Sequence, residues 1–151
     1  MSYVAPEVTA NDARVLAADA AEHLAQPLPP ARTTIVLDPP ASRQDDVMTP
    51  AMVERLRATG YGVVEAPRNP GKDAPPVEGV PLRYLVSPLQ AGVLMRLQYQ
   101  GVEAARFYPA RSRHLHAARS RGVFFVRVLP TTATPNANMQ GRRPRDPAPI
   151  S

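Results

Sequence analysis

The distribution of proline is the feature of this sequence that most limits its fold. The chain has 151 residues and 19 prolines, most of which lie in three stretches, 27–40, 67–81 and 130–149. Proline has no backbone N–H and disfavours helix in the residue before it. The three stretches are therefore predicted to be connections, with regular elements between them.

The first predicted helix runs from Asn11 to Gln26. Its apolar residues recur at helical spacing, and Asn11 and Asp12 are candidates for the N-cap and the negatively charged first turn. Pro27 follows directly, so the helix is expected to end there.

The second predicted helix runs from Thr49 to Thr59. Thr49 is the expected N-cap, and proline at the next position costs no hydrogen bond in the first helical turn. Gly60 is the expected C-cap. The acidic pair Asp45 and Asp46 precedes this helix, and we expect the pair to lie near its positive end.

The other regular segments are predicted strands. Val93 to Tyr99 alternates apolar and polar residues, which indicates a half-buried strand, and Gln100-Gly101 after it predicts a hairpin turn. Thr33 to Leu37 is mostly apolar, which favours a central strand. The other predicted strands are 60–65, 82–87, 102–108 and 122–128.

This order of elements predicts an α+β fold. We expect a two-layer sandwich with two helices packed on a mostly antiparallel sheet of four to six strands. One domain is expected over residues 11–129, with a long Pro-rich loop at 67–81 and a basic segment at 109–121. Residues 1–10 are expected to be a flexible N-terminal arm, and residues 130–151 a disordered tail rich in Pro and Arg.

Positive charge is concentrated in the last third of the chain. Up to Gln100 there are 9 basic and 11 acidic residues, whereas the rest has 9 basic and 2 acidic residues. A basic segment attracts nucleic acid, anionic lipid or acidic protein surfaces. The aromatic pair Phe124 and Phe125 near it could stack on bases, but its valine neighbours instead favour a core strand.

No pattern in the sequence indicates catalysis or metal binding. Cysteine is absent, which excludes disulfides, thiolate nucleophiles and Cys-ligated zinc. His114 and His116 have strand spacing suited to a metal, but no third ligand is near and several arginines are. We therefore predict that the protein is not an enzyme and has no catalytic residues, cofactor or metal.

No segment of the sequence suggests a membrane span. No run approaches the roughly 18 apolar residues that a spanning helix needs. The first residues have neither the basic nor the apolar region of an export signal. The chain is expected to be soluble, and any export signal to have been removed from it.

Several segments together resemble the TrbH family of conjugal transfer proteins. They are Ala18 to Leu24, Pro29 to Thr33, Val53 to Glu65 and Gly79 to Leu85. The resemblance covers about residues 11–108, and it rests on the order and spacing of these segments because none of them is a catalytic motif.

The resemblance implies a lipoprotein of the mating-pair formation apparatus, a bacterial type IV secretion system. The implied location is the periplasm, associated with the outer membrane, although this chain shows neither the signal peptide nor the lipidated cysteine. The implied partners are other secretion-channel subunits, or further copies of the chain in a ring. The alternative is a basic accessory protein that binds nucleic acid through its Arg-rich C-terminal third, although nucleic acid is not the expected partner.

Extended arms can bind other proteins by adding a strand to a sheet edge. The N-terminal residues and the segment after Pro130 are the natural arms of this chain. The predicted partner-binding residues are Tyr3, Val4, Arg111, Arg113, Arg119 and Arg121.

Overall fold

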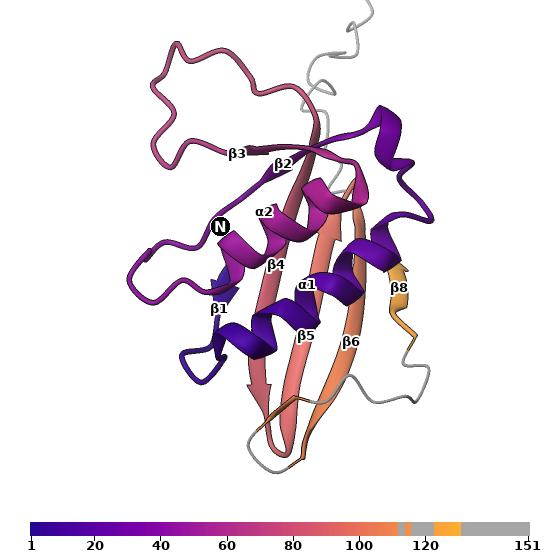
Figure 1. The fold of residues 1–151 in the computed structure, drawn as a ribbon. Coiled ribbons are helices and arrows are strands. Elements are labelled where there is room, and N and C mark those ends of the chain that lie inside the picture. The colour runs from indigo at the N-terminus through magenta and orange to yellow at the C-terminus, as the bar shows by residue number, and fades with distance from the viewer. Residues whose placement is uncertain (112–113, 116–122, 131–151) are drawn as a thin grey trace, which may run out of the picture.

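The computed structural model describes residues 1–111, 114–115 and 123–130. Two α-helices lie across one face of a mixed sheet of eight strands (Figure 1). The predicted two-layer α+β fold is confirmed, but the sheet is larger than four to six strands. The elements are β1 (Tyr3–Val4), α1 (Ala10–Leu24), a 3₁₀ turn (Pro30–Arg32), β2 (Thr34–Leu37), α2 (Met48–Thr59), β3 (Gly62–Glu65), β4 (Val80–Leu89), β5 (Gly92–Tyr99), β6 (Val102–Arg111), β7 (His114–Leu115) and β8 (Phe125–Val128).

The sheet combines a parallel part and an antiparallel part. Its order is β3-β2-β4-β5-β6, and β7 and β8 both pair with β6. β2 lies between β3 and β4 and is parallel to both, which confirms the central position predicted from its apolar sequence. The β4-β5-β6 meander and β8 are antiparallel, as predicted.

β4 begins inside the stretch that was predicted to be a loop. Its first residues, Val80 to Leu82, pair with β2 even though Pro81 is among them. The Leu82 carbonyl accepts a hydrogen bond from the Asp38 N–H, so the backbone of Leu82 faces β2. Backbone direction alternates along a strand, and the missing N–H of Pro81 therefore points away from β2 and costs this pairing nothing.

The N-cap of α1 lies two residues before the predicted cap, Asn11. Thr9 is the N-cap, and its hydroxyl accepts the Asp12 N–H while the Asp12 carboxylate accepts the Thr9 N–H. This is a capping box, with Asp12 in the place usually taken by Glu or Gln. Asn11 is therefore not the cap, although Asp12 does supply the negative first turn.

The start of α2 was also predicted incorrectly. The helix begins at Met48, and its N-cap Val47 has no capping side chain. The Asp46 carboxylate accepts the N–H groups of both Met48 and Thr49, at 3.2 and 3.0 Å. Asp46 thus lies at the positive end of the helix as expected, while Thr49 is inside it. Gly60, at φ 109°, forms the predicted left-handed C-cap.

The core lies between the two helices and the sheet. α1 contributes alanines and leucines to the core, and the small alanine side chains let the helix lie close to its neighbours. α2 contributes Met52 and Leu56, while Val53, also predicted to face the core, is only partly buried. On β5 the predicted inward face is confirmed, since Val93, Met95, Leu97 and Tyr99 are all buried.

The first ten residues pack against the domain, contrary to the expected free arm. Tyr3 and Val4 pair in parallel with Leu85 and Val86 of β4. Ala5 and Val8 are buried in the core. The arm therefore pairs with the sheet of its own chain, because half of one β4 edge is left open by β2.

The predicted tail at 130–151 lies outside the described residues, apart from Pro130. Among the described residues, neither helix has the length and apolar character that crossing a bilayer requires.

The capping box of α1 gives a direct test of the fold. Thr9→Ala removes the hydroxyl that accepts the Asp12 N–H, and it should lower the free energy of unfolding by about 1 kcal/mol. Asn11→Ala, at the cap position expected from sequence, should change it by less than about 0.5 kcal/mol. Urea denaturation followed by circular dichroism measures both. Equal losses in the two variants would contradict the assignment of Thr9 as the cap.

Candidate functional site

The sheet face opposite the helices, here called the open face, contains one polar row that crosses four strands. Arg83, Gln98, Glu103 and Arg127 are register partners on β4, β5, β6 and β8. Gln98 Nε2 donates to Glu103 at 2.8 Å, and the Arg127 guanidinium contacts the other carboxylate oxygen at 2.8 Å. Asp38 extends the row, since its carboxylate pairs with Arg83 and with the N-terminal ammonium group.

Glu103 is the acidic centre of this row. Only 5% of the residue is exposed, although it lies on the open face. The hydrogen bond from Gln98 and the nearby charge of Arg127 lower the pKa of its carboxyl group, against the opposing effect of burial. Glu103 is thus a structural anion that holds β8 against β6.

Two further rows of the open face are mainly apolar. One row runs through Tyr3, Leu85, Arg96, Ala105 and Phe125, which are partners in register. The other runs through Ser87, Leu94 and Phe107. Tyr3, Phe107 and Phe125 are exposed. The open face therefore presents aromatic rings to solvent, which is typical of surfaces that bind other proteins.

Gly92 is required where the Phe107 ring lies across the sheet. A Cβ atom added at Gly92 would stand 2.1 Å from the Tyr108 carbonyl oxygen and 2.8 Å from Phe107 Cζ. A side chain at this position would therefore push β6 and the ring away from β5.

The three most exposed large apolar side chains of the described chain lie on and beside β8. The β8 surface consists of Val123, Phe125, Val126 and Val128, which are 71%, 82%, 56% and 80% exposed. Isolated exposed apolar residues are normal, but here four lie within six positions, with Phe125 on the open face and Val126 and Val128 on the helix side of the strand.

The outer edge of β8 is unpaired among the described strands. The Leu129 N–H donates to the Gly101 carbonyl, so the backbone of Leu129 faces β6. Because strand backbone groups alternate, the N–H and C=O groups of Val126 and Val128 point away from β6. β8 thus offers both apolar side chains and free main-chain groups.

Phe124 fastens β8 to the helix layer. Phe124 is buried, and its ring centroid lies 4.5 Å from that of His23 in the last turn of α1. His23 Nε2 also lies 2.9 Å from the Tyr99 hydroxyl. Burial lowers the pKa of His23, which favours a neutral ring in this contact. The sequence predicted both phenylalanines in the core, and this is wrong for Phe125, which points the opposite way.

A buried ion pair lies beside this contact. Arg106 of β6 reaches Asp19 of α1 at 2.9 Å, and both side chains are largely buried. The Arg106 guanidinium also lies over the Tyr108 ring, 4.9 Å from its centroid. Burial raises the pKa of Tyr108 and keeps its hydroxyl protonated. These groups connect α1 to the sheet and show no arrangement of nucleophile and base.

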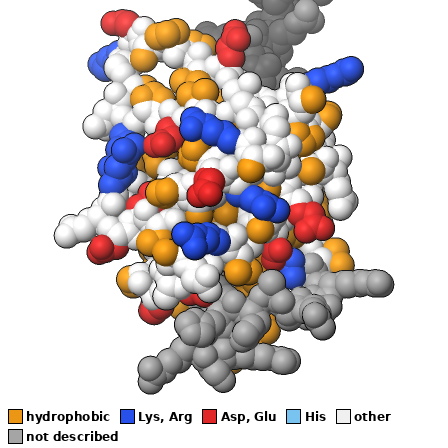
Figure 2. Space-filling view, viewed as in Figure 1, with side chains coloured by type: hydrophobic (Ala, Val, Ile, Leu, Met, Phe, Trp, Pro, Cys, Tyr) orange, Lys and Arg blue, Asp and Glu red, His pale blue; other side chains and the backbone are white. Residues whose placement is uncertain are grey.

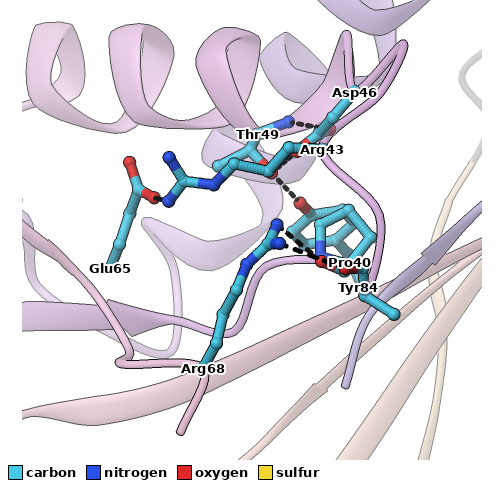
Figure 3. Close-up of polar contacts among 8 residues, drawn as sticks. Pro40, Arg43, Asp46, Thr49, Glu65, Arg68 and Tyr84 are labelled. Carbon is cyan, nitrogen blue, oxygen red and sulfur yellow. Dashed lines mark hydrogen bonds and ion pairs between the residues drawn. The ribbon is translucent and has the colours of Figure 1, made fainter.

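An open cleft of about 680 Å³ lies beside the start of α2, and Figure 3 shows the polar contacts near it. Arg43 and Glu65 form an ion pair across it at 2.9 Å. Thr49 donates to Asp46 at 2.5 Å, and its oxygen also lies 2.5 Å from the Tyr84 hydroxyl. Burial raises the pKa of Tyr84, so its hydroxyl stays protonated in this contact. The polar groups of this cleft are engaged in helix capping and ion pairing.

Charges of both signs are intermixed over the helix face of the molecule (Figure 2). This face therefore has no uniform basic surface of the kind that follows a nucleic-acid backbone. Within the described residues there is also no group of three metal-ligating side chains.

The structure separates the partner-binding residues predicted from sequence. Tyr3 is exposed on the open face, whereas Val4 is partly buried against the core. Arg111 ends β6, and Arg113, Arg119 and Arg121 lie outside the described residues. The structure does not test these assignments. Sequence analysis missed the β8 surface, and its only signal was the apolar run before Pro130.

An exposed apolar strand with an unpaired outer edge is typical of surfaces that bind other proteins. The model of the family described as conjugal transfer protein TrbH matches residues 1–124, and the chain belongs to this family. The match extends beyond residues 11–108, the range of the resemblance. No curated protein and no solved structure matches the chain. The protein is thus a component of conjugal transfer.

The lowered pKa of Glu103 predicts a dependence of stability on pH. The charged carboxylate stabilises the folded chain above the pKa of the unfolded state, and this contribution is lost as pH falls through the lower folded value. Glu103→Gln should therefore lower the free energy of unfolding near neutral pH and reduce its decline between about pH 6 and pH 3. Urea denaturation across this range measures the effect. Parallel pH curves for parent and variant would contradict it.

Proposed function

We propose that this protein is a non-catalytic structural subunit of a bacterial type IV secretion system used in conjugation. It acts by binding other proteins, and the observation that supports this most strongly is the exposed β8 surface. Each large apolar side chain that moves from water into an interface contributes roughly 1.5–3 kcal/mol. Four such residues beside an unpaired strand edge are a strong driving force for assembly.

The open face extends the proposed binding surface. Phe125 belongs both to the β8 surface and to the aromatic row that ends at Tyr3. A partner that covers β8 would thus meet an apolar surface continuous with the sheet. The arginines on this face, Arg83, Arg96 and Arg127, suit a partner with acidic residues around an apolar centre.

The proposed location is the periplasm, in association with the outer membrane, and the proposed partners are other subunits of the channel. Family membership supports a role in transfer machinery, and the resemblance supplies the location. The test is to tag the protein at its own locus, crosslink donor cells, fractionate the envelope and identify co-purified proteins by mass spectrometry. Recovery of channel subunits from the outer-membrane fraction is expected. Recovery of cytosolic nucleic-acid-binding proteins alone would reject the proposal.

Substitution at the β8 surface should impair transfer. Phe125→Ser removes the most exposed of its four side chains, so it should lower the transfer frequency from donor cells at least tenfold without reducing the protein level. Val77→Ser is the matched control, because Val77 is also exposed but lies in the loop before β4. Equal transfer by both variants and the parent would show that the β8 surface is not used.

The basic segment remains a proposed second contact, and Tyr3 and Val4 remain proposed contact residues of their own. Replacing Arg111, Arg113, Arg119 and Arg121 together with alanine should reduce recovery of channel subunits in the same crosslinking experiment. Undiminished recovery would remove these arginines from the binding surface.

A further inference from the structure

The residues of β8 limit which kind of strand can pair with its outer edge. Its outward-facing groups belong to Val126 and Val128, and Arg127 lies between them with its side chain on the open face. The Arg127 side chain is 70% exposed although it contacts Glu103. A partner strand therefore has to supply apolar residues on one face and a group that tolerates a guanidinium on the other.

We infer that this strand is β8 of a second copy of the chain, paired antiparallel about a two-fold axis at Val126. The inference deepens the proposed function, because it names the first partner of the β8 surface. The two sheets would then continue into one another through a self-complementary interface.

Charge, chemistry and strand overlap select this register among the four that centre on β8 residues. A two-fold axis at Arg127 would place this residue opposite its own copy, and like charges directly opposite are destabilising. An axis at Val128 would place Val126 opposite Pro130 of the partner subunit, which has no N–H to donate. An axis at Phe125 would place Val126, Arg127 and Val128 opposite residues that precede β8 in the partner subunit, so only Phe125 would pair within the strand. Only an axis at Val126 avoids all three problems.

The register centred on Val126 also makes favourable contacts. Arg127 lies opposite the partner's Phe125, and both side chains are on the open face because their partners on β6, Glu103 and Ala105, alternate in the same way. A guanidinium over an exposed aromatic ring is a favourable contact, and the symmetry forms it twice. Val126 exchanges two main-chain hydrogen bonds with its own copy.

The opposite edge of the sheet is less suited to pairing. The Gly62 N–H donates to the Thr33 carbonyl, so Val63 and Glu65 have the outward backbone groups of β3. The Val63 carbonyl already accepts a hydrogen bond from the Arg57 guanidinium at 3.3 Å. In a head-to-tail ring, in which β8 of one copy pairs with β3 of the next, the Val63 carbonyl would have to be shared with this guanidinium. The two-fold pair requires no such change.

Single cysteines test the register, because the natural chain has none. The full 151-residue chain is prepared with Val126→Cys, Arg127→Cys or Val128→Cys and oxidised under mild conditions. With the axis at Val126, its two Cα atoms stand about 5.5 Å apart, within disulfide range. The other two pairs are too far apart. Lys72→Cys, exposed in the loop before β4, measures random collision.

We expect Val126→Cys to form disulfide-linked dimers at least tenfold faster than each of the other variants. Faster linkage at residue 127 or 128, or no variant exceeding Lys72→Cys, would overturn the inference. Linkage between Val126→Cys and Val64→Cys in a mixture, more than within either alone, would support the ring in its place.

A proline substitution tests the main-chain bonds. Val126→Pro removes an N–H that points away from β6, so the fold should persist while dimerisation weakens at least tenfold in sedimentation analysis. Val126→Thr keeps both the N–H and the branched shape and should leave dimerisation within about threefold of the parent. A parent chain that stays monomeric at 100 µM would overturn the inference. If Val126→Pro unfolds by circular dichroism, the cysteine result decides alone.

The two proposals fail separately in these experiments. Capture of channel subunits without Val126 linkage would reject only the two-fold pair. Val126 linkage without capture of channel subunits would reject only the proposed role in the channel.

Discussion

Tyr84 is the residue on which the arrangement of the whole fold depends. It lies fully buried in the middle of β4, where its hydroxyl contacts Thr49 in the first turn of α2. Its N–H donates to the hydroxyl of Ser2, which in turn donates to the Asp38 carbonyl after β2. One strand position thus joins the N-terminus, the end of β2 and the start of α2. These four segments are far apart in the sequence, and none of them has enough local contacts to be stable alone.

The position of β4 explains how the sheet can be both parallel and antiparallel. Its long outer edge is divided between β2, at Val80–Leu82, and β1, at Leu85–Val86. Its other edge pairs with β5 along most of its length. The short strands β1 and β2 therefore share one edge of β4, and each pairs in parallel with a different part of it. The same division draws the N-terminal residues into the sheet. The described sheet then ends at β3 on one side and at β7 and β8 on the other.

β8 is held to the fold by contacts on both of its faces, yet most of its side chains stay exposed. Phe124 packs on His23 and Glu103 holds Arg127, so the strand is attached at both faces. α1 does not reach over the strand itself, and the valines on its helix side stay exposed. β8 is attached to its neighbours but is not covered by a helix, and this distinguishes it from the buried strands β2, β4 and β5. It gives a member of a conjugal transfer family a surface suited to assembly.

Local sequence signals were sufficient to predict most of the helices and strands. Alternation in 93–99, the Gly60 cap and the apolar strand at 34–37 each depend on residues near one another, and each was predicted correctly. The helix starts were less well predicted, because Thr9 and Asp46 compete with neighbouring polar residues that cap equally well in isolation. The family resemblance rested on the order of segments along the chain, and this order can be read from the sequence without the structure.

The candidate site, in contrast, could not be located from the sequence. Phe124 and Phe125 are adjacent and equally apolar, so composition placed both in the core. Which ring is buried depends on the register of β8 with β6 and on where α1 ends above the sheet. In the same way, the first residues resembled a free arm until the open half of the β4 edge was known. Sequence alone established which segments are strands and helices, because this depends on local pattern and chain geometry. Tertiary structure decided which strand edge stays open, because an edge is defined only by the strands that fail to cover it.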